Sequence, residues 1–194
     1  MSNVLPPDIS KKLKKLVFEI AEKEGYLNRD RASNKEFMDQ LVKHPQIGGV
    51  ISQYIEKSRV HKYIKDAIIN RYSKDKFIEA RKSVCLNKVI KDLFDIDVIE
   101  VEEIPNKKIS LFRKEAKDSR RFIVVGDGTY TKWETALRKV LCYSTDKHFY
   151  NNGQVEYLLN LYTQEKKVPQ SEKLFLTSTL NQINAKVHFF GEPQ

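Results

Sequence analysis

Three ionisable residues near the middle of the chain could assemble a metal site. Asp97 precedes a β-type run that ends at Ile104, and Glu115 and Lys117 lie at the far end of the next run. If Ile104 pairs with Lys108 across a short turn, the antiparallel register places Asp97 directly opposite Glu115. Two carboxylates beside an ammonium group can hold Mg²⁺ and activate water for attack on a phosphodiester. One hypothesis is therefore a magnesium-dependent nuclease, in which Asp97 and Glu115 bind the metal and act in catalysis with Lys117. Without that site, no cofactor is expected.

The same residues resemble the PD-(D/E)xK nuclease pattern, with Asp97 as the first acid and Glu115-Ala116-Lys117 as the triplet. The resemblance covers residues 97–117 and implies Mg²⁺-dependent cleavage of a nucleic acid. In that family the two parts usually lie on the second and third strands of a meander, whereas here they are expected on the first and second. The alternative interpretation is a cross-strand charge cluster at the edge of a sheet.

A pair of glycines follows the third β-type run. Gly126-Asp127-Gly128 is expected to form a turn ahead of a basic helix. The expected order is a helix, three strands and a second helix, with Gly126–Lys132 leading from the third strand into that helix. This order resembles a double-stranded-RNA-binding domain. The resemblance implies that Lys132, Arg138 and Lys139 grip phosphate groups.

Basic side chains offer a broader candidate surface. The periodicity of Val60, Ile64, Ala67 and Ile68 predicts a helix over residues 58–72 with a basic outer face. In a helix-turn-helix this element would lie in the major groove, although an ordinary solvated helix shows the same pattern. The residues predicted to contact nucleic acid are Arg59, Lys62, Lys65, Arg71, Lys107, Lys108, Arg120, Arg121, Lys132, Arg138 and Lys139.

Histidines and cysteines suggest no further chemistry. None of the histidines has a metal-ligand spacing or a paired nucleophile, so packed or surface positions are expected for His44, His61, His148 and His188. Cys85 and Cys142 fall in helix-like segments and are predicted to be reduced core residues. A cytoplasmic location fits two unpaired thiols, and a nuclear one is also open.

The apolar spacing divides the chain into two parts. Residues 1–84 show helical spacing, compatible with a helix-turn-helix, and residues 85–194 are expected to form an α+β domain. The predicted fold is a three-stranded antiparallel meander flanked by helices, an α-β-β-β-α core, with a short C-terminal strand. The expected elements are helices at 85–94, from 131 to 141, from 155 to 162 and from 171 to 184, and strands at 98–104, 109–112, 122–125 and 187–190.

The charge balance favours a polyanionic partner. The chain has 35 Lys and Arg against 26 Asp and Glu, a net charge of +9. Such an excess attracts nucleic acid through Coulomb forces and counterion release. The leading interpretation is therefore a sequence-tolerant protein that binds the phosphate backbone of DNA or RNA. A protein–protein adaptor with an acidic partner is the other alternative. No apolar run is long enough to cross a membrane, and the oligomeric state is open.

Overall fold

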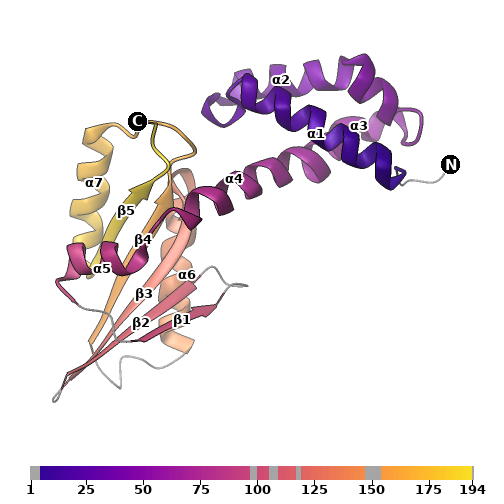
Figure 1. The fold of residues 1–194 in the computed structure, drawn as a ribbon. Coiled ribbons are helices and arrows are strands. Elements are labelled where there is room, and N and C mark those ends of the chain that lie inside the picture. The colour runs from indigo at the N-terminus through magenta and orange to yellow at the C-terminus, as the bar shows by residue number, and fades with distance from the viewer. Residues whose placement is uncertain (1–4, 97–99, 105–108, 117–118, 147–153, 194) are drawn as a thin grey trace. The chain divides into compact units, whose positions relative to one another are not determined.

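The computed structural model describes residues 5–96, 100–104, 109–116, 119–146 and 154–193 (Figure 1). The chain divides into two compact units, a helical unit (Met1–Ile78) and an α+β unit (Glu79–Gln194). The boundary between the two units lies after Ile78, a few residues before the boundary predicted at residue 84. No helix in the described ranges is both long and apolar enough to span a bilayer.

The helical unit is built around one apolar core. Leu13 and Val17 of the first helix pack in the same cluster as Phe37 of the second and Ile64 and Ile68 of a later segment. The helical elements that contribute are α1 (Pro7–Lys23), η1 (Tyr26–Asn28), α2 (Arg31–Lys43), η2 (Pro45–Gly49), α3 (Lys57–Tyr63), η3 (Ile64–Ile69) and the first part of α4 (Asn70–Lys82).

Local capping residues set the ends of the first two helices. Gly25 has φ +58°, a conformation that glycine adopts without strain, and it follows the last turn of α1. The α2 helix begins at Arg31, because the Asp30 carboxylate accepts a hydrogen bond from the Ser33 backbone N–H over 2.8 Å.

The helix predicted over residues 58–72 has different limits. α3, η3 and α4 follow one another from Lys57 to Lys82 with no intervening turn. η3 is a π-helical segment that buries Ile64, Ile68 and Ile69 in the core. Its wider turns change the angular step between residues, so a regular α-helical wheel does not describe the faces beyond Tyr63.

The α+β unit contains a five-stranded mixed sheet in the order β1-β2-β3-β4-β5 (Figure 1). The first three strands form an antiparallel meander, and β3, β4 and β5 run parallel, joined by α6 and α7. The elements are α5 (Leu86–Phe94), β1 (Glu100–Ile104), β2 (Ile109–Ala116), β3 (Ser119–Thr129), η5 (Tyr130–Lys132), α6 (Trp133–Asp146), β4 (Gln154–Tyr162), α7 (Gln170–Asn181) and β5 (Ala185–Phe190).

The predicted fold class is therefore wrong, because the sheet does not end at the meander. The segment expected to be a helix from residue 155 is the strand β4, hydrogen-bonded between β3 and β5. From Tyr157 to Tyr162 every residue of β4 is buried. A strand covered on both faces is apolar at successive positions, and such a run satisfies helical spacing as well as strand spacing.

Helices cover both faces of the sheet. On one face, Val140 of α6 and Leu180 of α7 pack in a cluster with Val124 and Leu159. On the other face, Leu86 and Ile90 of α5 pack with neighbours from the same strands, Ile123, Val125 and Leu158. Successive residues of β3 thus contact opposite layers.

The glycine pair of the sequence lies inside β3 and forms no turn. A Cβ atom on Gly126 would lie 2.5 Å from Val140 Cγ1, and one on Gly128 would lie 2.8 Å from Ala136 Cβ. Both glycines are needed because α6 packs closely against this end of β3. The five-stranded sheet and the position of these glycines both depart from the double-stranded-RNA-binding pattern that the sequence suggested.

Candidate functional site

The β1–β2 hairpin has a register different from the one predicted. Ile104 pairs with Ile109, so the ladder is displaced by one residue. Such a displacement exchanges the two faces of a strand. Glu115 lies on β2 and pairs with Arg120 of β3, while Asp97 and Lys117 lie outside the described residues. The two-carboxylate geometry therefore has no support from the described part of the hairpin. Nor do the described residues bring together three or more His, Cys, Asp or Glu side chains that could hold a metal ion.

On α3 and η3, two of the predicted basic residues are free. Lys62 and Lys65 are exposed and form no ion pair with any residue the structure describes. Arg59 Nε lies 4.0 Å from a Glu56 carboxylate oxygen, at the limit of an ion pair. Arg71, at the start of α4, is engaged by Asp75, with 2.9 Å between Nε and Oδ1.

In the α+β unit the predicted basic residues lie in different settings. Lys107 and Lys108 lie outside the described residues, and Arg120 lies on β3. Arg121 is held by Glu156 of the neighbouring strand, with a hydrogen bond of 3.1 Å from Nε and a second from an Nη atom. The exposed residues of η5 and α6, which have no ion pair among the described side chains, are Lys132, Arg138 and Lys139.

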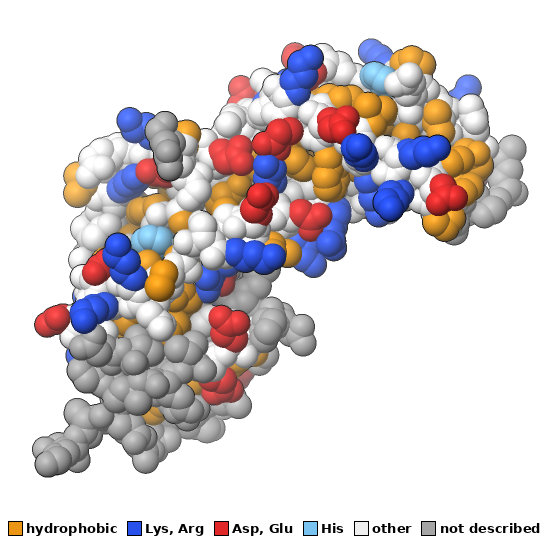
Figure 2. Space-filling model, viewed as in Figure 1, with side chains coloured by type: hydrophobic (Ala, Val, Ile, Leu, Met, Phe, Trp, Pro, Cys, Tyr) orange, Lys and Arg blue, Asp and Glu red, His pale blue; other side chains and the backbone are white. Residues whose placement is uncertain are grey.

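Most acidic side chains of the helical unit are already engaged. On the face of this unit that is visible in Figure 2, Lys and Arg side chains are interspersed with Asp and Glu side chains. The contacts are Glu19 with Lys15, Glu22 with Lys76 and Tyr72, Glu24 with Arg29, Asp30 with the Ser33 N–H, Glu56 with Arg59, Asp66 with Asn70, and Asp75 with Arg71. Hydrogen bonds from Lys76 and Tyr72 lower the pKa of Glu22 below its ordinary value.

Ten exposed cations of the same unit have no such partner. They are called the unpaired cations here, since no acidic residue in the described ranges lies within ion-pair distance of them. They are Lys11, Lys12, Lys23, Arg31, Lys35, Lys43, Lys57, Lys62, Lys65 and Lys74.

A row of polar side chains crosses the parallel part of the sheet. Asp127, Asn160 and His188 occupy paired positions on β3, β4 and β5. Asn160 Nδ2 donates to Asp127 Oδ1 over 2.6 Å, and His188 Nδ1 lies 2.8 Å from Asn160 Oδ1. Arg81, near the end of α4, donates from Nε to both carboxylate oxygens of Asp127, at 2.8 and 2.9 Å. Asn160 is fully buried, so this row provides the hydrogen-bond partners that a buried amide requires.

The direction of these hydrogen bonds requires a hydrogen on one particular nitrogen of the imidazole. Because Asn160 donates its amide hydrogen to Asp127, its oxygen must accept from His188, and the neutral ring then carries its hydrogen on Nδ1. Burial, reinforced by the positive charge of Arg81, lowers the pKa of His188. The lowered pKa favours the neutral ring, in which Nε2 is a hydrogen-bond acceptor. Sequence spacing missed this arrangement.

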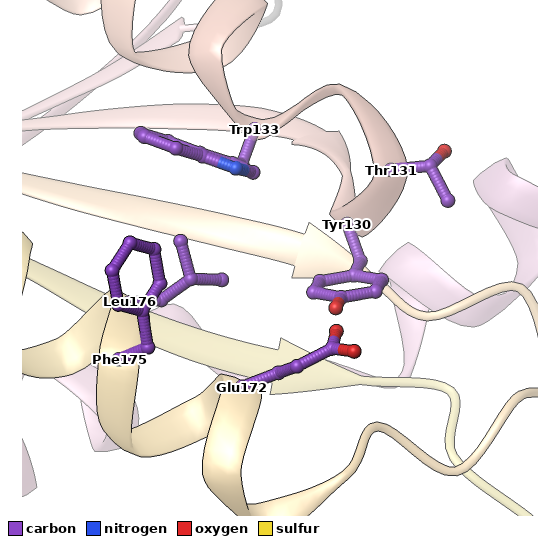
Figure 3. A pocket seen from close by; sticks show the side chains of 6 residues that line it. All are labelled: Tyr130, Thr131, Trp133, Glu172, Phe175 and Leu176. Atoms are coloured by element: carbon purple, nitrogen blue, oxygen red, sulfur yellow. The ribbon is translucent and has the colours of Figure 1, made fainter.

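A pocket of about 480 Å³ lies between the segment that follows β3 and the first turns of α7. Figure 3 shows the Tyr130 hydroxyl and the Glu172 carboxylate pointing toward each other, with the rings of Trp133 and Phe175 on the other part of its wall. Phe175 is 63% exposed, which is unusual for a phenylalanine. The residues that line the pocket are Tyr130, Thr131, Trp133, Glu172, Phe175 and Leu176.

The cysteines differ from their predicted setting. Cys85 and Cys142 are both unpaired thiols, but they are exposed and do not lie in the core. Cys85 precedes α5 as its N-cap residue, and Cys142 lies on the outer side of α6. The prediction of buried cysteines was wrong because a cysteine beside apolar residues in sequence need not share their face.

Among the other histidines, His61 is exposed, and His148 lies outside the described residues. His44 Nδ1 accepts a hydrogen bond from the Gln46 N–H.

No protein-family model matches the chain, and comparisons with curated proteins and with solved structures found no match either.

Proposed function

We propose that the protein binds nucleic acid through sequence-tolerant contacts to the phosphate backbone, made mainly by the helical unit. The observation that supports this is the pairing of charges in that unit. Residues 1–78 contain 16 Lys and Arg against 10 Asp and Glu. Ion pairs within the unit engage at least five of these acids, whereas the unpaired cations form none with the described residues. The excess positive charge therefore resides on the unpaired cations, which are free to meet an external anion.

The type of cation favours phosphate contacts over reading of bases. Nine of the ten unpaired cations are lysines, and only Arg31 has a guanidinium group. An ammonium group acts as a point charge, whereas reading guanine in the groove usually relies on the planar fork of arginine. Phosphate contacts supply affinity and release counterions, but they carry no sequence information. The proposed binding is therefore similar for unrelated sequences.

The charge-reversal variant Lys62→Glu/Lys65→Glu tests this function. Both side chains are exposed within one helical turn, so the fold should tolerate the change. Binding to two unrelated DNA duplexes is expected to weaken about tenfold or more at low salt, and by the same factor for both. Fluorescence anisotropy with labelled duplex DNA, single-stranded DNA and duplex RNA would measure the effect and rank the three forms.

A matched control separates local contact from overall charge. Lys82→Glu/Lys88→Glu makes the same change in net charge at two exposed lysines of the α+β unit that the proposal does not use. This control should retain most of the affinity. An equal loss in both variants would show that only net charge matters, and the assignment to the helical unit would then be abandoned.

The proposed setting is cytoplasmic, with a nuclear one as the alternative. Two unpaired thiols on the surface suit a reducing compartment.

A further inference from the structure

The pocket beside α7 combines aromatic rings with one uncompensated carboxylate. Tyr130, Trp133 and Phe175 contribute three aromatic side chains, and Glu172 contributes the only carboxylate among the residues that line the pocket. Glu172 is exposed in the first turn of α7 and forms no ion pair or side-chain hydrogen bond with any described residue. A negative charge therefore lies at a wall that is otherwise mainly apolar.

The cation nearest to Glu172 in sequence is engaged elsewhere. Lys173 Nζ lies 2.8 Å from a Glu192 carboxylate oxygen and 5.6 Å from the centre of the Phe189 ring. It is also half-buried, so it is not free to neutralise its neighbour. The charge of Glu172 thus remains available to a ligand in the pocket.

The chemistry of these groups selects one class of ligand. The faces of aromatic rings carry negative electrostatic potential and attract cations, and a carboxylate adds a full negative charge at the same place. A nucleotide would bring phosphate close to Glu172 and be repelled. We infer that this pocket binds an organic cation with apolar substituents, such as an alkylated ammonium group, with Glu172 as its counter-ion and the rings of Trp133 and Phe175 against its substituents.

The size of the pocket is consistent with that class. A volume of about 480 Å³ is within the range of small-molecule sites. The cation can belong to a free small molecule or to the methylated lysine of a peptide. Both present the same ammonium group, and the experiment below separates them.

Trp133 makes the test direct, because it is the single tryptophan of the chain and lines the pocket. Its fluorescence should change in a saturable way on titration with choline. The neutral analogue 3,3-dimethyl-1-butanol has the same shape without the charge and should bind about tenfold more weakly or not at all. A short peptide with one trimethylated lysine is the second arm, and the tighter of the two ligands identifies the source.

Two variants assign the contacts. Glu172→Gln keeps the size of the side chain and should weaken choline binding about tenfold, and Phe175→Leu should weaken it without changing the thermal unfolding temperature greatly, because Phe175 is exposed. Glu79→Gln, an exposed carboxylate outside the pocket, is the matched control and should bind like the wild type. Equal binding of the neutral analogue, unchanged binding by Glu172→Gln, tighter binding of guanosine monophosphate, or no saturable change would each overturn the assignment.

Discussion

Asn160 Nδ2 donates a hydrogen bond to Asp127 Oδ1 over 2.6 Å, between paired positions of the parallel strands β4 and β3. The two residues are separated in sequence by the whole of α6, so this contact forms only when the crossover is complete. Asp127 is also paired with Arg81, and both side chains are mostly shielded from water. A slip of one residue between the strands would leave these groups buried without partners. We therefore expect this network to fix the register of the parallel strands.

Replacing Asp127 tests the contribution of that network to stability. Asp127→Asn leaves Arg81 without its counter-ion and is expected to lower the free energy of unfolding by about 3 kcal/mol. Urea unfolding followed by circular dichroism would measure the change. Asp146→Asn, at an exposed carboxylate of α6, is the matched control and should change stability little. A loss below about 1 kcal/mol for Asp127→Asn would mean that the network adds little.

The lowered pKa of His188 predicts a loss of stability in acid. The unfolded chain takes up a proton at this imidazole near pH 6.5, whereas in the folded state the pKa lies below that value. The contribution of the group is thus complete above about pH 6.5 and is lost as the pH falls toward the folded pKa. Thermal unfolding from pH 8 to pH 5 should show a steeper loss for the wild type than for His188→Gln. His61→Gln, at an exposed histidine, should keep the wild-type profile, and identical profiles for all three proteins would contradict the assignment.

The close packing of α6 on β3 predicts a strong effect of one added methyl group. In Gly128→Ala the new Cβ would lie 2.8 Å from Ala136 Cβ, so the helix must shift, at an expected cost of about 1–3 kcal/mol. Gly49→Ala is the control, since its Cβ would meet nothing nearer than His44 O at 3.9 Å. A small change, or a small gain, is expected there. Similar melting temperatures for the two variants would show that α6 adapts freely.

Local patterns in the sequence predicted many of the elements. The helix from residue 171, the strand from 187, and the order of helix, three strands and helix all appear as α7, β5 and α5-β1-β2-β3-α6. The helical first half was predicted from apolar residues at helical spacing.

The wrong predictions concern β4 and the hairpin register, which depend on contacts between different segments of the chain. Val155, Leu158 and Leu159 fit a helix as well as a strand, and only the packing of β4 between two neighbours decides which one forms. The predicted hairpin register depended on the length of the turn after Ile104. Ile104 pairs with Ile109 and not with Lys108, and this shift of one residue exchanges the two faces of the strand.

The polar row could not be found by spacing at all. Asp127, Asn160 and His188 are brought together by two helical crossovers, so their distances in sequence carry no signal. One hint was available, because an acid between two glycines at the end of an apolar run is unusual for a strand. That hint was interpreted as a turn.

The dependence of duplex binding on salt tests the central claim most directly. With about 4–6 phosphate contacts from the unpaired cations, the logarithm of the association constant should fall with the logarithm of salt concentration with a slope of roughly −3.5 to −5.5. Lys62→Glu/Lys65→Glu should reduce the magnitude of that slope by about 2, because each lysine that contacts a phosphate contributes about 1. A slope near zero, or no binding to DNA or RNA at low salt, would contradict the account and favour an acidic protein as the partner of the helical unit.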